Sequence, residues 1–129
     1  MALIVHYPLI DGNLENIGLD DKAITVNGSI PFANGRVRTA PTFSSNPNNY
    51  YTLSVEPKSQ DFSICMWFKL NSLSTTQNLF WVGDTIDKAH VFWDSTNSSL
   101  LCVMGDKTIT IPQAGNFEAN KWYHLAFTV

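Results

Sequence analysis

Aromatic rings that occur near side-chain amides are the residues of this chain with the most distinctive chemistry. The candidates are Trp67, Trp93, Tyr50, Asn48 and Asn49. A flat ring can stack on the C–H face of a sugar while an amide bonds to its hydroxyl groups, as in mostly apolar sites with a few polar groups. The same rings could instead fill a core or form cross-strand pairs. Packing is favoured for every ring except Trp67, where both interpretations stay open because Ser63 and Lys69 alternate with it.

A second group consists of three aspartates, Asp84, Asp94 and Asp106, which lie at or just beyond the ends of expected strands. Calcium takes six to eight oxygen ligands, many of them carboxylates and loop carbonyls. A calcium site at one rim of the fold is therefore one interpretation. The other is that these residues close turns, since an aspartate side chain bonds to nearby backbone. The turn interpretation is favoured because the chain contains no D-x-D-x-D-G loop.

Residue patterns typical of catalysis do not occur in the sequence. Glycoside hydrolysis needs two carboxylates across the scissile bond, but Glu15, Glu56 and Glu118 are isolated in expected loops. The three histidines fall in separate strands without the spacing of zinc ligands. No G-x-S-x-G, phosphate-binding loop or H-E-x-x-H motif is present. We therefore expect a protein that is not an enzyme.

Composition narrows the class further. The chain has 129 residues, 44% of them hydrophobic and 15% charged, with a net charge of -3, which predicts one globular domain over residues 1–129. Lysines and arginines are scattered, so nucleic acid is not an expected partner. No apolar run reaches the ~20 residues of a membrane span, and no basic residue precedes the apolar start. We therefore expect no membrane insertion. We also expect synthesis in the cytoplasm without a signal peptide.

The two cysteines, Cys65 and Cys102, lie in strand-like segments. We expect two buried free thiols, as is common in proteins made in the cytosol. A disulfide between them stays open if their strands are neighbours.

The elements that must position these residues are all strands. In residues 61–70 every second residue is apolar, which predicts a core strand with one dry face and one mixed face that carries Trp67. Two Asn-Gly pairs, at Asn27 and Asn34, predict hairpin turns within a small meander. The other expected strands are 3–9, 23–26, 29–32, 36–39, 51–55, 79–82, 89–93, 100–104, 108–111 and 122–129. The core is expected to contain Tyr7, Leu53, Ile64, Met66, Phe68, Leu125 and Phe127.

Four segments in this order resemble one family. They are H-Y-P-L at residue 6, D-F-S-I-C-M-W-F-K-L at residue 61, L-F-W-V-G-D ending at residue 84, and K-W-Y-H-L-A-F-T-V at the end of the chain. Together they are similar to laminin-G-like, concanavalin A-like jelly-roll domains. The resemblance implies an all-β antiparallel sandwich, and a module that binds glycan or protein ligands at rim loops or on a sheet face, sometimes with calcium.

The resemblance also suggests a setting. The family continues through further strands after the W-Y-H-L segment, so the chain is expected to be the N-terminal part of a longer protein. Such modules occur in adhesins and in phage tail or fibre proteins, which makes a virion or particle surface the expected location and other virion or assembly subunits the expected partners. An assembly module completed by a neighbouring chain is the alternative, and a fragment of a sandwich glycosidase is a third.

Overall fold

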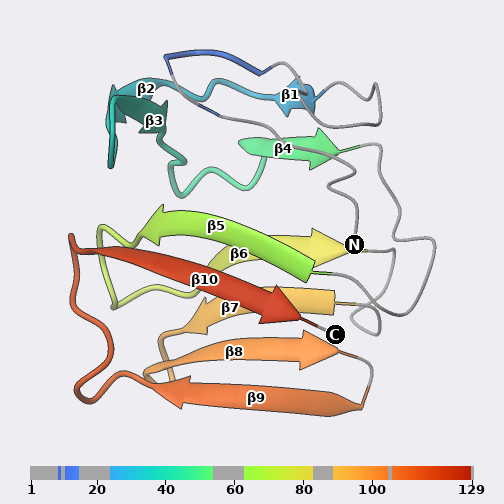
Figure 1. The fold of residues 1–129 in the computed structure, drawn as a ribbon, viewed down its shortest axis with the longest axis vertical. Helices are drawn as coiled ribbons and strands as arrows, with labels where there is room; N and C mark the ends of the chain where they lie inside the picture. The colour runs from blue at the N-terminus through green and yellow to red at the C-terminus, as the bar shows by residue number, and fades with distance from the viewer. Residues whose placement is uncertain are drawn as a thin grey trace. The chain divides into compact units, whose positions relative to one another are not determined.

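The structure is a computed structural model that describes residue 9 and residues 11–14, 24–53, 63–82, 89–104 and 106–128. Every regular element in these residues is a β-strand, and every described strand pair is antiparallel. The chain forms two compact units, Met1–Val55 and Glu56–Val129. Both contain strands (Figure 1), and each is described separately below. A single domain over residues 1–129 stays a prediction.

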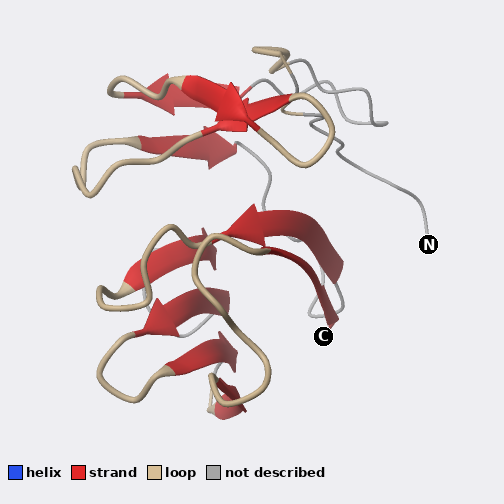
Figure 2. Ribbon diagram, turned by 90° about the vertical axis from the view of Figure 1, so that its left-hand side faces the viewer, coloured by secondary structure: helices blue, strands red, loops and turns tan. Residues whose placement is uncertain are grey.

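The second unit is a sandwich of two sheets. One sheet has the order β6-β7-β8-β9, and the other pairs β10 with β5. Figure 2 shows the two layers from the side. The strands of the larger sheet are β6 (Gln77–Val82), β7 (Ala89–Asp94), β8 (Ser99–Met104) and β9 (Lys107–Pro112). The strands of the smaller sheet are β5 (Ser63–Lys69) and β10 (Trp122–Thr128).

The core of this unit lies between the two sheets. Alternation puts every second side chain of a strand on the same face, and the buried residues follow that spacing on β7, β5 and β10. All of them belong to one apolar cluster. Its buried members are Phe68, Leu70, Ala89, Val91, Trp93, Leu100, Cys102, Leu125 and Phe127. Side chains one residue away along the same strands face outward, so each sheet has an inner and an outer face.

Trp93 is the most deeply buried large side chain, with 0% of its surface exposed. Its indole Nε1 donates a hydrogen bond to the Leu73 carbonyl at 2.9 Å, which removes the penalty for burying that polar group. The ring of Phe117 packs edge-on against Trp93, with centroids 5.8 Å apart, and lies 5.0 Å from Tyr123. Phe117 thus connects β7 to β10 through the loop between β9 and β10.

The described residues of the first unit form two strand pairs. β1 (Ile24–Asn27) pairs with β4 (Tyr50–Leu53), and β2 (Phe32–Asn34) pairs with β3 (Thr39–Pro41) through a four-residue loop. The Asp11 carboxylate accepts hydrogen bonds from the Arg38 guanidinium at 3.0 Å and from the Thr39 backbone at 3.2 Å. These bonds tie the Asp11 turn to β3.

The strand predicted over residues 61–70 is confirmed as β5. Phe68 and Leu70 are buried, Ile64 and Met66 are partly buried, and Trp67 on the other face is exposed. The predicted strands near residues 79, 89, 100, 108 and 122 are also confirmed, within a few residues at their ends. Tyr7 lies outside the described residues, as does most of the strand predicted over 3–9.

Three details of the prediction for the first unit are wrong. Leu53 is 36% exposed, so it does not belong to the core. The strands predicted over 29–32 and 36–39 lie later, as β2 and β3. Gly28 has the positive φ of 76° expected for an Asn-Gly turn, but β1 pairs with β4 and not with the next strand, so there is no meander. The separation in sequence of β1 and β4 explains the error, because turn signals report only local pairing.

Both cysteines are free thiols, but only Cys102 is buried. Cys65 is exposed on the outer face of β5, whereas Cys102 lies on the inner face of β8 in the other sheet. The expectation of two buried thiols is therefore wrong for Cys65. Side chains on different faces of different sheets cannot reach the short separation that a disulfide requires.

We expect one fast-reacting thiol in the native protein. Burial raises the pKa of the Cys102 thiol, and a buried thiol that is not ionised reacts slowly. Titration with a chromogenic disulfide reagent should detect one thiol before unfolding and two in denaturant. Cys65→Ser should abolish the native signal, and rapid reaction of both thiols in the native wild type would contradict the assignment.

The hydrogen bond of Trp93 should contribute measurably to stability. Trp93→Phe keeps an aromatic ring but leaves the Leu73 carbonyl without its donor, which should lower the free energy of unfolding by about 1–3 kcal/mol. Trp81→Phe is the matched control, since Trp81 is 51% exposed, and should change it by less than about 0.5 kcal/mol. Urea unfolding measures both, and equal effects of the two substitutions would contradict the role of the buried indole.

Candidate functional site

The outer face of the β5–β10 sheet carries two cross-strand pairs. Trp67 lies opposite His124, with ring centroids 5.1 Å apart, and Lys69 lies opposite Trp122. The ammonium of Lys69 lies 5.5 Å from the centre of the Trp122 ring, within the range of a cation–π contact. Trp67 is 51% exposed. We refer to Trp67, Lys69, Trp122 and His124 as the Trp67 face.

The outer face of the four-stranded sheet carries a row of aromatic rings. Trp81 on β6 packs against its cross-strand partner His90, with centroids 5.3 Å apart, and His90 stacks on Phe92 at 4.3 Å. The Asn78 side chain bonds to the His90 Nε2 at 2.9 Å. Asn78 and Trp81 are exposed, while His90 and Phe92 are half-buried. We refer to these four residues as the Trp81 row.

A β-bulge makes the Trp81 row possible. The register of β6 against β7 shifts between Asn78 and Phe80, which places one extra residue in β6 and reverses its alternation from that point. Before the bulge, Asn78 faces outward. After it, Phe80 packs against the core and Trp81 faces outward. Trp81 is one of the rings for which the sequence favours core packing over ligand contact, and for this ring that interpretation is wrong.

The Trp81 row carries no full charge at neutral pH. Burial lowers the pKa of His90 below its ordinary value, because a partly buried ring is harder to protonate. A neutral imidazole has one donor and one acceptor nitrogen. The adjoining outer face continues with apolar residues of β8 and hydroxyl-bearing residues of β9. By register these are Leu101, Val103, Thr108 and Thr110.

The candidates from the sequence lie in different places. Trp67 is exposed, but Trp93 is fully buried, so its assignment as a ligand-contacting ring is wrong. Tyr50 is 49% exposed on β4. Asn48 is exposed in the loop before β4. Asn49 already uses its side chain, which accepts from the Ser29 backbone at 3.2 Å and donates to a serine hydroxyl at 2.9 Å. These three residues belong to the first unit, whereas Trp67 belongs to the second.

Asp94 closes a turn. Its carboxylate accepts from the Thr96 backbone at 2.9 Å and from the Asn97 side chain at 2.7 Å. The hydrogen bond from the Asn97 side chain is the main reason that the pKa of Asp94 lies below its usual range. These bonds support the alternative that the aspartate has a local structural role.

Asp94 and Asp106 cannot belong to one calcium site. Asp94 ends β7 beside the start of β8, whereas Asp106 lies in the turn after β8 ends. Because a strand rises about 3.3 Å per residue, the six residues of β8 keep these ends roughly 17 Å apart. The candidate calcium set of three aspartates is therefore wrong for this pair, and Asp84 lies outside the described residues. Among the residues described, no cluster of three or more metal-binding side chains occurs.

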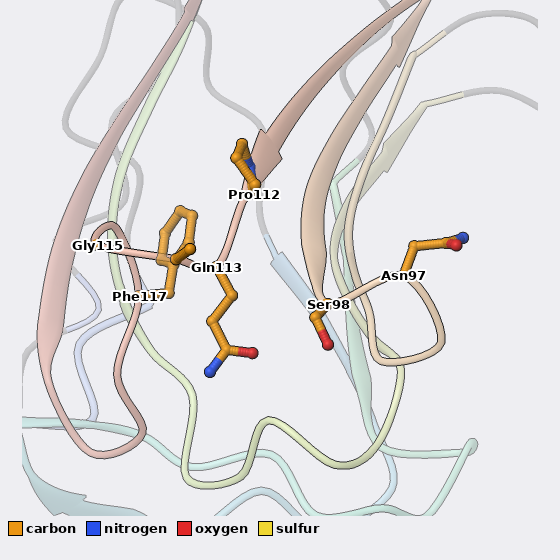
Figure 3. Close-up of a pocket in the computed structure, with 7 residues that line it drawn as sticks. Asn97, Ser98, Pro112, Gln113, Gly115 and Phe117 are labelled. Carbon is orange, nitrogen blue, oxygen red and sulfur yellow. The ribbon is translucent and has the colours of Figure 1, made fainter.

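A shallow depression of about 510 Å³ lies at the rim that Asp94 supports. Its lining comes from the turn before β8 and from the start of the loop after β9, which are joined by a 2.8 Å bond from the Gln113 backbone to the Ser98 carbonyl. The Gln113 amide and the Ser98 hydroxyl lie on facing sides of the opening, while the Asn97 side chain points away (Figure 3). This depression is open and lined by residues of two turns, polar and apolar together, so it gives less shape to a ligand than either sheet face.

Comparison with known protein families matches residues 43–129 to the concanavalin A-like lectin/glucanases superfamily. The match spans about two thirds of the chain and includes both sheets of the sandwich. The chain belongs to this superfamily. No curated protein and no solved structure matches the chain.

Membership of the concanavalin A-like lectin/glucanases superfamily agrees with the antiparallel sandwich and with the resemblance in the sequence. It associates the fold with carbohydrate- or protein-binding modules and also with glucanases. In the part of the chain that the structure describes, no helix is long and apolar enough to cross a bilayer.

Asp94→Ala should lower the urea midpoint of unfolding at neutral pH. The pKa of Asp94 is lower in the folded protein than its ordinary value, so the carboxylate stabilises the fold above about pH 4 and loses this contribution as the pH falls through the folded pKa. The difference between variant and wild type should therefore shrink on acidification.

Asp106→Ala is the matched control for this measurement. The Asp106 side chain is 87% exposed and its ion pair with Lys107 has a separation of 3.6 Å, a geometry that contributes little. A difference between Asp94→Ala and wild type that is constant between neutral and acid pH would show that the charge of Asp94 is not what stabilises the turn.

Proposed function

We propose that this superfamily member is a non-catalytic recognition module that binds a surface glycan through the Trp81 row. The observation that carries the proposal is an indole that stays 51% exposed while it packs beside His90. Burying such a ring in the protein would stabilise the fold, so its exposure is what a ligand-stacking surface requires.

The neighbours of Trp81 suit a sugar. The Asn78 amide and the His90 ring are fixed by their mutual hydrogen bond, which leaves the remaining donor and acceptor positions oriented before a ligand arrives. The row is flanked by apolar side chains of β8 and by two threonines of β9. A flat apolar surface with a few oriented polar groups matches a sugar ring, which has an apolar C–H face and a polar hydroxyl edge.

The carboxylates support a binding role over glycoside hydrolysis. Of the acidic residues that the structure describes, Asp11 bonds to Arg38 and Thr39, Asp94 bonds to its own turn, and Glu118 pairs with Lys121 at 2.6 Å. Asp106 lies at the opposite end of β8 from Asp94. Two carboxylates facing one another across a substrate are the requirement for hydrolysis, and these four residues do not supply such a pair.

The wider setting of the module is also a proposal. It is displayed on a virion or particle surface, where other virion or assembly subunits are its partners, and this rests on the family resemblance. An assembly role is the second candidate. It is favoured by the small sheet, because within the described residues β5 and β10 pair only with one another, and an unpaired strand edge can accept a strand from another chain.

Nuclear magnetic resonance of the four indole N–H groups separates these roles. A glycan array, run with and without calcium, first selects a ligand. During titration, the indole signal of Trp81 should shift while that of Trp93 stays fixed, since Trp93 is buried and bonded to Leu73. Trp81→Ala should weaken binding at least about tenfold, the effect of removing a central aromatic contact.

Two outcomes would contradict the glycan proposal. One is an array without any ligand. The other is a ligand whose affinity does not change in Trp81→Ala. If light scattering then shows a stable oligomer at micromolar concentration, the assembly role replaces the recognition role.

A further inference from the structure

We propose that the Trp67 face is a second binding surface, which selects sugars that carry a carboxylate. The proposal rests on the proposed function for the class of ligand, a glycan, but on different residues and on a different sheet. Its physical basis is the arrangement of two indoles and two side chains with a basic nitrogen, Lys69 and His124, on one face of β5 and β10.

The four residues form a chequered pattern. Trp67 and Lys69 alternate along β5, and their partners His124 and Trp122 reverse the order on β10. Each indole therefore has a side chain with a basic nitrogen opposite it on the other strand. The observed contacts confirm both pairs, at 5.1 Å between the Trp67 and His124 rings and 5.5 Å between the Lys69 ammonium and the Trp122 ring.

The ionisable side chains of this face include basic groups and no carboxylates. The two strands place eight residues on it, in the pairs Ser63–Thr128, Cys65–Ala126, Trp67–His124 and Lys69–Trp122. None of the eight is acidic. Among the residues that the structure describes, the Lys69 ammonium has the Trp122 ring as its neighbour on this face and no carboxylate, so its charge remains available to an anion. A cation held over a ring also loses less conformational entropy when a ligand binds.

The spacing fits a uronate residue. Side chains two positions apart on a strand are about 7 Å apart, so a sugar ring stacked on Trp67 can extend its exocyclic carboxylate to Lys69. The His124 ring edge lies beside Trp67 and offers a further nitrogen to a hydroxyl group. Two flat rings favour a sugar over an acidic peptide, because a peptide chain offers no comparable C–H face.

The Trp81 row differs from the Trp67 face in charge, because its four residues include no lysine or arginine. His90 is its single titratable member, and burial lowers the pKa of that ring. The two outer faces therefore present the same kind of aromatic surface with different charge. A neutral sugar suits the Trp81 row, and a uronate suits the Trp67 face.

The test uses the full chain and two forms of one ligand. Oligogalacturonate and its methyl ester share the same sugar backbone, and esterification removes the charge of each carboxyl group while adding one methyl group. We expect the acid form to shift the Trp67 indole signal and to bind at least about tenfold more tightly than the ester, the loss expected for one charge-assisted bond. Trp93, which is fully buried, provides the unchanged reference signal.

Variants assign this selectivity to residues. Lys69→Gln should lower the affinity for the acid form to that for the ester and leave the ester unchanged, whereas Trp67→Ala should weaken both. Trp81→Ala should have no effect on the acid form. Because these side chains are on the outer faces, near-ultraviolet circular dichroism should report a folded core in every variant.

Several results would overturn the proposal. They are equal affinities for the acid and the ester, an unchanged acid affinity in Lys69→Gln, and a poly-glutamate peptide that binds as tightly as the uronate. No binding of either form at millimolar concentration overturns it as well. The glycan proposal for the Trp81 row fails separately, through Trp81→Ala, so the two failures are distinguishable.

Discussion

The packing of Phe117 between the two sheets is the contact on which the sandwich most depends. Its ring touches Trp93 on β7, and it lies 6.4 Å from Phe68 on β5 and 5.0 Å from Tyr123 on β10. Within the described residues the smaller sheet has two strands, whereas the larger one has four strands aligned by hydrogen bonds. Aromatic contacts across the core therefore set the distance between the layers, since close-packed interiors tolerate few voids.

This core determines what the outer faces can do. Alternation places a strand residue either inside or outside. The large rings inside the sandwich are Trp93, Phe68 and Phe117. The two half-exposed indoles, Trp67 and Trp81, are then left on opposite outer faces of the unit. A rigid sheet holds each of them beside fixed neighbours, so little ordering remains to be done when a ligand binds.

The sequence predicted much of this fold and less of the site. Period-two alternation located β5, β7, β8, β9 and β10, because a buried inner face imposes that pattern. The pairing of β1 with β4 could not be predicted, because it joins distant segments and local turn signals do not report it. Trp67 was recognisable from Ser63 and Lys69 on its face. Trp93 resembled it in sequence but lies inside, since only the tertiary packing decides which face of β7 is covered.

The β-bulge in β6 shows that backbone pairing, as well as side-chain identity, determines which side chains a sheet face exposes. Phe80 and Trp81 are adjacent in the sequence, and the bulge that accommodates Leu79 before them decides which ring enters the core. Loss of Leu79 alone would remove the bulge and keep the arrangement, because Phe80 would then follow Asn78 in regular alternation, with Phe80 inside and Trp81 outside. If the same strand instead paired without a bulge, Leu79 would face inward, Phe80 outward and Trp81 inward. The outward indole thus depends on one unpaired backbone residue and not on the identity of any side chain.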